Sequence, residues 1–308
     1  MRAIAINAFK EAPDFLEIPD PQPGEGEVLV DVEFASVNGM DLMTWLGYVE
    51  GMMPYEFPIT LGRDFSGTIA VLGSGVEGYK IGDAVFGMYM AMPIHVGAFA
   101  PQIRIPVSSI SKRPDGVDAK TAGALSLAGG AAKLAVDAVA PKGGETALVS
   151  GATGGVGALA MQMLKAKGAY VIATATPDQA AFVTDYGADE TVDFTGDLAG
   201  AVRAQHPQGV DIVLHFAGDG ATLVNLLKPG GRVASLLGLG FQPLERTDVT
   251  ATPVMTIPSP ELLQALGAKV ASGELRVPIT KTYPLAEAGQ AMTDFSGGAL
   301  GKLSIAVR

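Results

Sequence analysis

The sequence contains no cysteine in 308 residues. This absence excludes disulfide bonds, thiolate zinc sites, iron–sulfur clusters and cysteine nucleophiles. Histidine is also scarce, because the chain has only three, and none of them has a partner at the spacing of a metal site. The sequence therefore shows no recognisable set of metal ligands.

Positively charged residues are also fewer than negatively charged ones. The chain has 21 Lys and Arg against 32 Asp and Glu, which gives a net charge of −11, and no basic cluster stands out. This balance opposes tight binding to nucleic acid or to an anionic lipid surface. We therefore expect no nucleic-acid or membrane partner, and an anionic cofactor must be held by backbone amides and a few local cations.

Signals for export or membrane insertion are weak. The apolar patch at the N-terminus is interrupted by Asn7 and is too short for a signal peptide, which predicts a cytoplasmic protein. Residues 146–164 are uncharged and long enough to suggest a membrane span. Four glycines lie within residues 151–157, however, and strands and helices alternate after them, so we expect no membrane association.

These glycines form the most informative motif. They separate a predicted strand, residues 146–150, from an apolar helix that ends near Gly168, and amides at such a helix N-terminus bind pyrophosphate. Against the pattern G-x-G-x-x-G the chain has Ala152, Gly154 and Gly157, although Gly151 stands just before them. A glycine turn that serves packing alone is the alternative. The predicted cofactor contacts are Gly151, Ala152, Thr153, Gly154, Gly155, Val156 and Gly157.

The pattern of predicted strands and helices changes along the chain. Residues 1–115 contain short alternating strands separated by glycine turns, which predicts a small barrel or sandwich. Residues 116–255 alternate helices with fully apolar strands, which predicts a parallel sheet covered on both faces. Residues 256–308 return to short strands, and we expect this tail to pack back on the N-terminal β domain.

A family resemblance rests on eight short segments. They are VNGMD at 37–41, PITLGRDFSG at 58–67, GDAVFG at 82–87, GAFA at 97–100, GGVG at 154–157, LKPGGRV at 227–233, YPLAEA at 283–288 and GK at 301–302. In this order they resemble the medium-chain dehydrogenase/reductase superfamily, over nearly the whole chain. The resemblance implies a Rossmann doubly wound parallel sheet plus a GroES-like β-barrel domain built from the N-terminal part and the C-terminal tail.

Within that superfamily the chain resembles the zinc-independent quinone oxidoreductase branch. Zinc-dependent relatives place cysteine, histidine and cysteine where this chain has Asn38, Arg63 and Leu127, and neither arginine nor leucine can bind zinc. The resemblance implies transfer of hydride from NADPH to a quinone or an α,β-unsaturated carbonyl, by a homodimer without metal. The alternatives are a nucleotide-binding protein without turnover and a zinc-dependent alcohol dehydrogenase.

The choice of NADPH depends on the end of the second strand of the parallel sheet. A site for NAD normally places an acidic residue there, whereas this chain has Ala175 followed by Thr176. Relatives commonly supply a lysine shortly afterwards, which is missing here, and Asp178 adds a negative charge that Arg203 or Lys133 could offset. A site that accepts either cofactor is the alternative. The predicted cofactor site is completed by Ala175, Thr176, Ala217 and Leu237.

Three side chains are the predicted catalytic residues. The Asn38 amide can donate to a carbonyl oxygen, orient the nicotinamide ribose or merely cap a turn. Asp41 can titrate in an apolar pocket or cap a helix, and Tyr48 is a hydrogen-bond donor or a packed surface ring. His95 is a further candidate proton donor.

The pocket also departs from the family pattern. Relatives often carry two tyrosines where this chain has Met43 and Val49, and a threonine where it has Ala131. Because of these departures, a nucleotide-binding protein without turnover stays an alternative.

Overall fold

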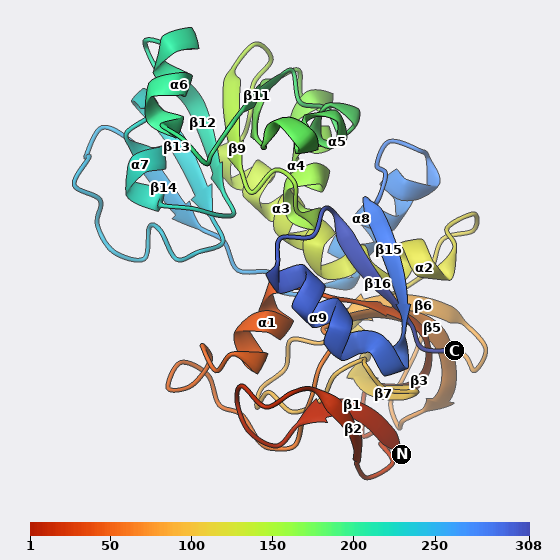
Figure 1. Ribbon diagram of the computed structural model, residues 1–308. Coiled ribbons are helices and arrows are strands. Elements are labelled where there is room, and N and C mark those ends of the chain that lie inside the picture. Colours follow the sequence, from red (N-terminus) through yellow and green to blue (C-terminus); the bar gives the residue numbers. More distant parts are fainter. The chain divides into compact units, whose positions relative to one another are not determined.

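The computed structural model describes residues 1–308 and divides into two compact units. We call Met1–Gly130 with Ile257–Arg308 the β unit, and Ala131–Thr256 the parallel-sheet unit (Figure 1). The division falls inside α3 (Ser126–Val139), not at residue 115. The reason is that α2 (Ala119–Gly123) packs on the β unit, where Ser66 Oγ donates to the Ala119 carbonyl.

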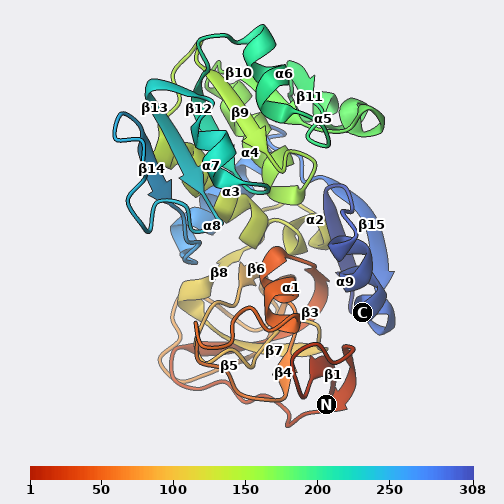
Figure 2. The same ribbon diagram turned by 60° about the vertical axis from the view of Figure 1, so that its left-hand side comes forward.

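The parallel-sheet unit is built on six strands that all run in the same direction. Their order is β11-β10-β9-β12-β13-β14, so the chain winds outward from β9 first one way and then the other. Figure 2 shows β10, β9, β12, β13 and β14 side by side. Their bounds are β9 (Thr146–Ser150), β10 (Tyr170–Thr174), β11 (Glu190–Val192), β12 (Val210–His215), β13 (Leu227–Ser235) and β14 (Thr250–Pro253). This confirms the predicted doubly wound Rossmann sheet.

Helices cover both faces of this sheet. Right-handed crossovers place α4 and α5 on one face and α6 and α7 on the other, as Figure 1 shows. The strands are apolar on both sides because both faces are buried, and β12 contributes Val210, Ile212, Val213 and Leu214 to the interior. The helices are α4 (Gly155–Ala166), α5 (Ala180–Asp185), α6 (Leu198–Gln205) and α7 (Gly220–Val224), with the 3₁₀ turn η2 (Pro177–Gln179) before α5.

The β unit is mostly antiparallel. One sheet has the order β15-β16-β3-β5-β6-β8, with β7 also paired to β3, and a smaller sheet has the order β2-β1-β4. The strands are β1 (Arg2–Ile6), β2 (Asp14–Glu17), β3 (Glu27–Ser36), β4 (Ile59–Thr60), β5 (Asp64–Leu72), β6 (Ala84–Met88), β7 (Gln102–Pro106), β8 (Ile110–Lys112), β15 (Ile279–Pro284) and β16 (Lys302–Ala306). The remaining helices are α1 (Gly39–Trp45), α8 (Pro260–Ala271) and α9 (Ala288–Ser296), with 3₁₀ turns η1 (Val107–Ser109) and η3 (Leu285–Glu287).

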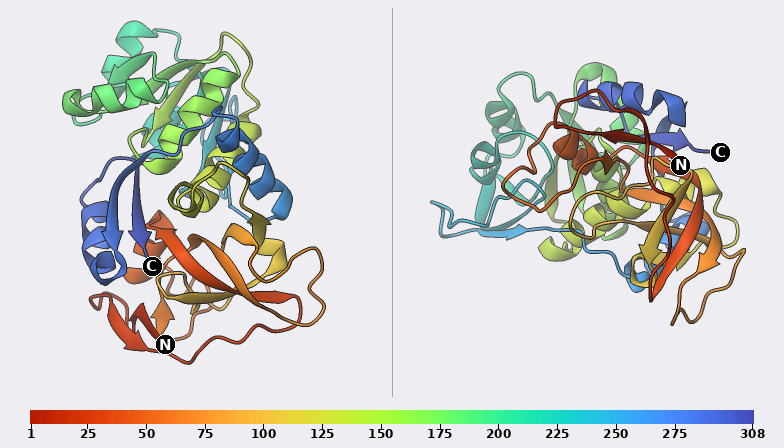
Figure 3. Two further views of the ribbon diagram at one scale, coloured as in Figure 1. Left: turned by 90° about the vertical axis from the view of Figure 1, so that its right-hand side faces the viewer. Right: turned by 90° about the horizontal axis from the view of Figure 1, so that it is seen from below.

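The C-terminal tail completes this unit, as predicted. Strand β16 pairs antiparallel with β3, with Ser304 opposite Ser36, and β15 lies parallel to β16 (Figure 3). Both chain ends therefore belong to the β unit, which confirms the GroES-like domain assembled from two distant segments. No helix is long and apolar enough to cross a lipid bilayer.

Candidate cofactor site and buried polar cluster

The glycine turn between β9 and α4 brings the start of the helix close to the end of the strand. Gly151 has φ of +73°, a conformation that glycine adopts without strain, so it supplies the tight turn that Ala152 could not. A Cβ on Gly157 would lie 2.3 Å from the Gly151 carbonyl oxygen, so only glycine lets α4 begin this close to β9. Gly154 is the N-cap and has no side chain to accept from the first helical N–H groups, which leaves them available to an anion.

A cavity of about 530 Å³ lies at the carboxyl ends of β9, β10 and β12. Neighbouring strands β9 and β12 lead in opposite directions across the sheet, and such a switch point is where open α/β sheets bind their ligands. The volume is in the range of small-molecule sites. The lining includes Ser150, Gly151, Thr153, Thr174, Ala217 and Gly218.

The structure brings part of the predicted cofactor set to this cavity. Gly151, Thr153 and Ala217 line it, whereas Ala152 and Ala175 are buried and Leu237 is exposed beyond β13. The sequence prediction omitted two hydroxyls at strand ends. Ser150 Oγ donates to the Ala217 carbonyl, and Thr174 Oγ1 accepts from the Gly151 N–H at 3.2 Å. Both residues are the polar last position of an otherwise apolar strand, a signal that the sequence does contain.

His215, at the end of β12, has a structural role. Its Nδ1 lies 3.0 Å from Ser235 Oγ and its Nε2 lies 3.1 Å from the Gly218 carbonyl oxygen. The carbonyl can only accept, so Nε2 carries the proton and Nδ1 accepts from the serine. The buried ring thus ties the end of β12 to β13 and to the loop that follows β12.

A cluster of buried polar side chains occupies the β unit where β3, β5 and β16 meet. Asp64 Oδ1 accepts from Ser36 Oγ at 2.6 Å and from Asn38 Nδ2 at 3.0 Å. Lys302 Nζ donates to Asn38 Oδ1 at 2.6 Å and to the Val37 carbonyl at 2.9 Å, and it lies 3.7 Å from Asp64 Oδ2. Burial raises the pKa of Asp64, and Lys302, Ser36 and Asn38 oppose that rise.

This cluster defines what Asn38 can do. Its amide nitrogen donates both protons, one to Asp64 and the other to the Ser36 carbonyl at 3.2 Å. Its oxygen accepts from Lys302. In this arrangement Asn38 has no proton left for a carbonyl oxygen. Asn38 is also the N-cap residue of α1.

Asp41 and Tyr48 occupy contrasting positions. Asp41 is fully buried in the first turn of α1, where Oδ2 accepts from the Asn38 N–H and Oδ1 from the Gly62 N–H, both at 2.9 Å. Both carboxylate oxygens of Asp41 are therefore occupied by backbone N–H groups, although the N-cap residue of α1 is Asn38. The Tyr48 side chain is 62% exposed. The structure thus places Asn38 and Asp41 together at the start of α1 and Tyr48 at the surface just after this helix.

Burial raises the pKa of Asp41 to about 6; Arg63 opposes the rise and Asp64 adds to it. Because the folded-state pKa exceeds the ordinary one, this carboxyl stabilises the fold below about pH 4, and the contribution is lost as pH rises through 6. The Asp41→Asn variant cannot titrate and loses one backbone contact. We expect its stability deficit to be about 1–2 kcal/mol smaller at pH 7.5 than at pH 5, measured by urea unfolding.

The exposed Asp115→Asn variant is the control for the loss of one carboxylate. An Asp41→Asn deficit that is equal at both pH values, or larger at pH 7.5, would contradict the expected titration.

Arg63 is buried to 1% exposure beside this cluster. Nη1 donates to the Val96 carbonyl at 3.2 Å, whereas Nε and Nη2 have no hydrogen-bond partner. The backbone N–H of Leu127 donates to Asp64, so Asn38, Arg63 and Leu127 are indeed neighbours. Their amide, guanidinium and alkyl side chains do not form a zinc site. No group of three or more His, Asp and Glu side chains in the chain is placed to hold a metal ion.

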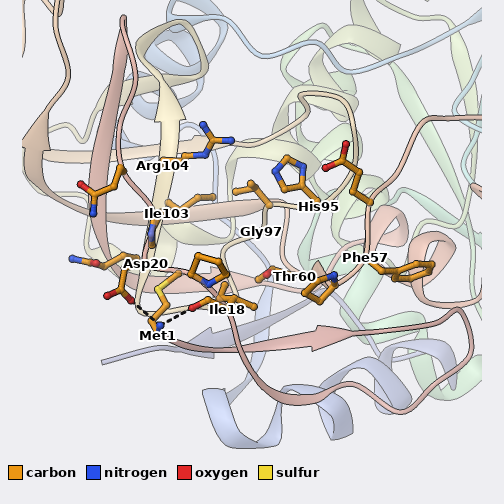
Figure 4. Close-up of a pocket in the computed structure, with 16 residues that line it drawn as sticks. Met1, Ile18, Asp20, Phe57, Thr60, His95, Gly97, Ile103 and Arg104 are labelled. Carbon is orange, nitrogen blue, oxygen red and sulfur yellow. Dashed lines mark hydrogen bonds and ion pairs between the residues drawn. The ribbon is translucent and has the colours of Figure 1, made fainter.

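A second cavity, of about 370 Å³, lies in the β unit and contains His95 (Figure 4). The ring Nδ1 lies 3.0 Å from the Pro93 carbonyl oxygen, which can only accept, so Nδ1 carries the proton and Nε2 is an acceptor. Asn38, Asp41 and Tyr48 do not line this cavity. The structure therefore does not bring His95 together with the other predicted catalytic residues.

A doubly wound sheet with a glycine turn, joined to a β domain that the C-terminal strands complete, defines a two-domain, nucleotide-dependent dehydrogenase. Family models agree with this class. Residues 24–115 match the alcohol dehydrogenase GroES-like domain, and residues 155–270 match the zinc-binding dehydrogenase model. The chain belongs to the medium-chain dehydrogenase/reductase superfamily, whose members use a nicotinamide cofactor.

The chain is also similar to individual proteins of this superfamily. The chain is 28% identical to the chloroplast envelope quinone oxidoreductase homolog of Arabidopsis thaliana, over 99% of this chain and 98% of that protein. It is 31% identical to the acryloyl-coenzyme A reductase of Sulfurisphaera tokodaii, over 62% of this chain and 64% of that protein. The solved quinone oxidoreductase of Coxiella burnetii superimposes with a TM-score of 0.91 at 28% identity, covering 100% of this chain and 99% of that one. The protein is thus an oxidoreductase related to quinone oxidoreductases and acryloyl reductases.

Proposed function

We propose that the protein transfers hydride from a reduced nicotinamide dinucleotide to a quinone or to an alkene conjugated with a carbonyl. The observation that carries this proposal is the glycine turn at the switch point, with helical N–H groups free beside a 530 Å³ cavity. Relatives named as quinone oxidoreductases and as acryloyl-coenzyme A reductases support these two substrate classes. Both are electrophilic π-systems that accept a hydride at carbon or oxygen.

The residues of the parallel-sheet unit fit such a cofactor. The N–H groups at the start of α4 would bind the pyrophosphate, because the helix dipole favours negative charge there. Ser150 and Thr174 hold the turn in shape through their bonds to Ala217 and Gly151. When bound, the reduced nicotinamide would supply the hydride. The protein contributes binding and orientation, and the proton that balances the reaction comes from water or a polar side chain.

Asn38, Asp41 and Tyr48 remain our proposal for the catalytic set, with roles limited by their contacts. Asn38 has no side-chain proton free for a ligand, so it would position the groups around it. Asp41 would hold the backbone N–H groups of Asn38 and Gly62 in place. Tyr48, with an exposed hydroxyl, is the one of the three that is free to donate a proton. The measurable consequence is that Tyr48→Phe lowers kcat, whereas Asp41→Asn lowers stability first.

The proposed function is tested by following absorbance at 340 nm with a panel of quinones and enones. Oxidation of the dinucleotide that depends on one of these acceptors supports it. Tight binding of a dinucleotide without turnover of any acceptor would favour the non-catalytic alternative. The sequence prediction of NADPH as the donor rests on Ala175 and stays a prediction.

We also propose the predicted homodimer, through the edge of the parallel sheet. Strand β14 pairs only with β13, so its outer backbone groups are unpaired within the chain. Near it, Phe241 and Met255 are 60% and 63% exposed. Pairing of two β14 strands would cover both features. We expect a solution mass of twice 31.5 kDa by light scattering, and a shift toward the monomer in Met255→Lys. A wild-type mass of one chain at micromolar concentration would contradict the dimer.

A further inference from the structure

The cavity that contains His95 is not used by the proposed hydride transfer. Its volume is about 370 Å³, and its lining comes entirely from residues 1–104 of the β unit. It shares no residue with the cavity at the glycine turn, and Asn38, Asp41 and Tyr48 do not line it. The volume is near the lower end of the range of small-molecule sites, which suits a ligand of one or two rings.

The buried part of this cavity's wall is uncharged (Figure 4). Ile103 is 1% exposed, Thr60 is 3% exposed and Gly97 is buried as well. Most of the remaining wall is apolar and consists of Ile18, Pro19, Pro21, Phe57, Pro58 and Val96. A charged group placed against this wall would lose its hydration without gaining an ion partner. The part of a ligand that enters the cavity is therefore uncharged.

The charged side chains of the lining lie at its exposed rim. Asp20 and Glu56 are both exposed to solvent. Arg104 is the one lysine or arginine of the lining, and its guanidinium already lies 3.5 Å from the Glu27 carboxylate. The rim thus offers two acids and a cation that has a partner. This balance disfavours a carboxylate or a phosphate as the ligand.

Two polar side chains of the lining have unused hydrogen-bonding capacity. The Thr60 hydroxyl makes no hydrogen bond within the chain, although buried hydroxyls are normally paired. His95 Nε2 is an acceptor without a partner, because Nδ1 carries the proton that faces the Pro93 carbonyl. The two residues are neighbours, since the Thr60 N–H donates to the His95 carbonyl at 3.0 Å. A hydroxyl group on a ligand can donate to one of them and accept from the other.

We propose that this cavity is a binding site for a neutral aromatic alcohol, that is, a phenol of one or two rings. The phenol hydroxyl donates to His95 Nε2 and accepts from the Thr60 hydroxyl, which gives both groups the partner that they lack. The aromatic ring lies against the apolar wall, where the Phe57 ring and three proline rings present flat surfaces. A phenol is also a stronger donor than an aliphatic alcohol, because its proton is more acidic.

The test is binding of 2-naphthol to the full chain at pH 7.5, followed by the fluorescence of the ligand and by calorimetry. Three analogues with the same two rings separate the contributions: naphthalene lacks the hydroxyl, 2-naphthoate is an anion and 2-naphthylmethylammonium is a cation. We expect 2-naphthol to bind about tenfold more tightly than each of them. Equal or tighter binding of any of the three analogues would contradict a site for a neutral alcohol.

Two substitutions locate the site. Thr60→Val removes the hydroxyl with little change in volume, and His95→Phe removes the acceptor but keeps an aromatic ring. We expect each variant to bind 2-naphthol about fivefold more weakly and naphthalene as before. Thr60→Val should not lower the temperature of thermal unfolding, because the hydroxyl has no partner to lose. Thr282→Val, the same change at an exposed position of β15, is the matched control and should leave the affinity for 2-naphthol unchanged.

Two other results would overturn the phenol site. One is the absence of saturable binding of 2-naphthol. The other is binding that neither Thr60→Val nor His95→Phe weakens, which would place the phenol elsewhere on the chain. Since these measurements use no dinucleotide and no turnover, their failure would leave the proposed hydride transfer untouched, and that proposal is decided by the assay with quinones and enones.

Discussion

Replacing Gly154 by alanine is expected to weaken dinucleotide binding by about 100-fold while leaving the stability of the fold unchanged. Gly154 has φ of −80°, which any residue adopts, and a Cβ there would lie 3.5 Å from its nearest neighbour, the Gly151 carbonyl oxygen. The fold therefore accommodates the methyl group. The bound pyrophosphate does not, because the N-cap is where its oxygens approach the first N–H groups of α4.

Gly157→Ala provides the matched comparison, since the same methyl group is added three residues later. Its Cβ would lie 2.3 Å from the Gly151 carbonyl oxygen and 2.6 Å from the Ala152 Cα, both of which are backbone atoms. We expect a loss of about 1–3 kcal/mol of stability from this overpacking. Thermal unfolding and dinucleotide titration of both variants separate the two effects. Undiminished binding by Gly154→Ala would show that the turn does not contact the cofactor.

Local patterns in the sequence were sufficient to predict the architecture of the parallel-sheet unit. Apolar strands such as residues 210–215 are bounded by glycine and acidic caps, and each signal lies within a few residues of the element that it specifies. The substitution of Ala152 for the first motif glycine did not matter, because Gly151 takes the positive φ that the turn requires.

The contacts of the candidate site could not be predicted in the same way. Lys302 and Asn38 are 264 residues apart, and only the register of β16 on β3 brings them within 2.6 Å. The sequence presents them as two unrelated motifs. Likewise Asp178 is three residues beyond Ala175, and its position beside Thr176 depends on the η2 turn. Side-chain function in these cases is decided by tertiary geometry, which no local pattern encodes.

Lys302→Met is expected to destabilise the β unit by about 3–5 kcal/mol. Lys302 is 2% exposed, and its removal leaves the fully buried Asp64 without a cation and deprives Asn38 Oδ1 and the Val37 carbonyl of their donor. Methionine fills a similar volume, so the loss of stability comes from the missing charge and hydrogen bonds more than from a cavity. Urea unfolding at pH 7 measures it. Lys281→Met is the control, because Lys281 is 57% exposed and its pair with Asp294 is a surface one, for which little change is expected.

The partner substitution shows whether the uncompensated charge causes the loss. Asp64→Asn removes the carboxylate, so the double variant with Lys302→Met lacks both charges of this buried pair. We therefore expect the double variant to be more stable than Lys302→Met alone, with a coupling energy of about 1–3 kcal/mol. Without Lys302 the pKa of Asp64 rises further, since burial already raises it and the main opposing charge is gone. Protonation then relieves the buried charge, so the deficit of Lys302→Met must shrink as pH falls. A deficit that is independent of pH and additive with that of Asp64→Asn would mean that Lys302 acts through packing alone.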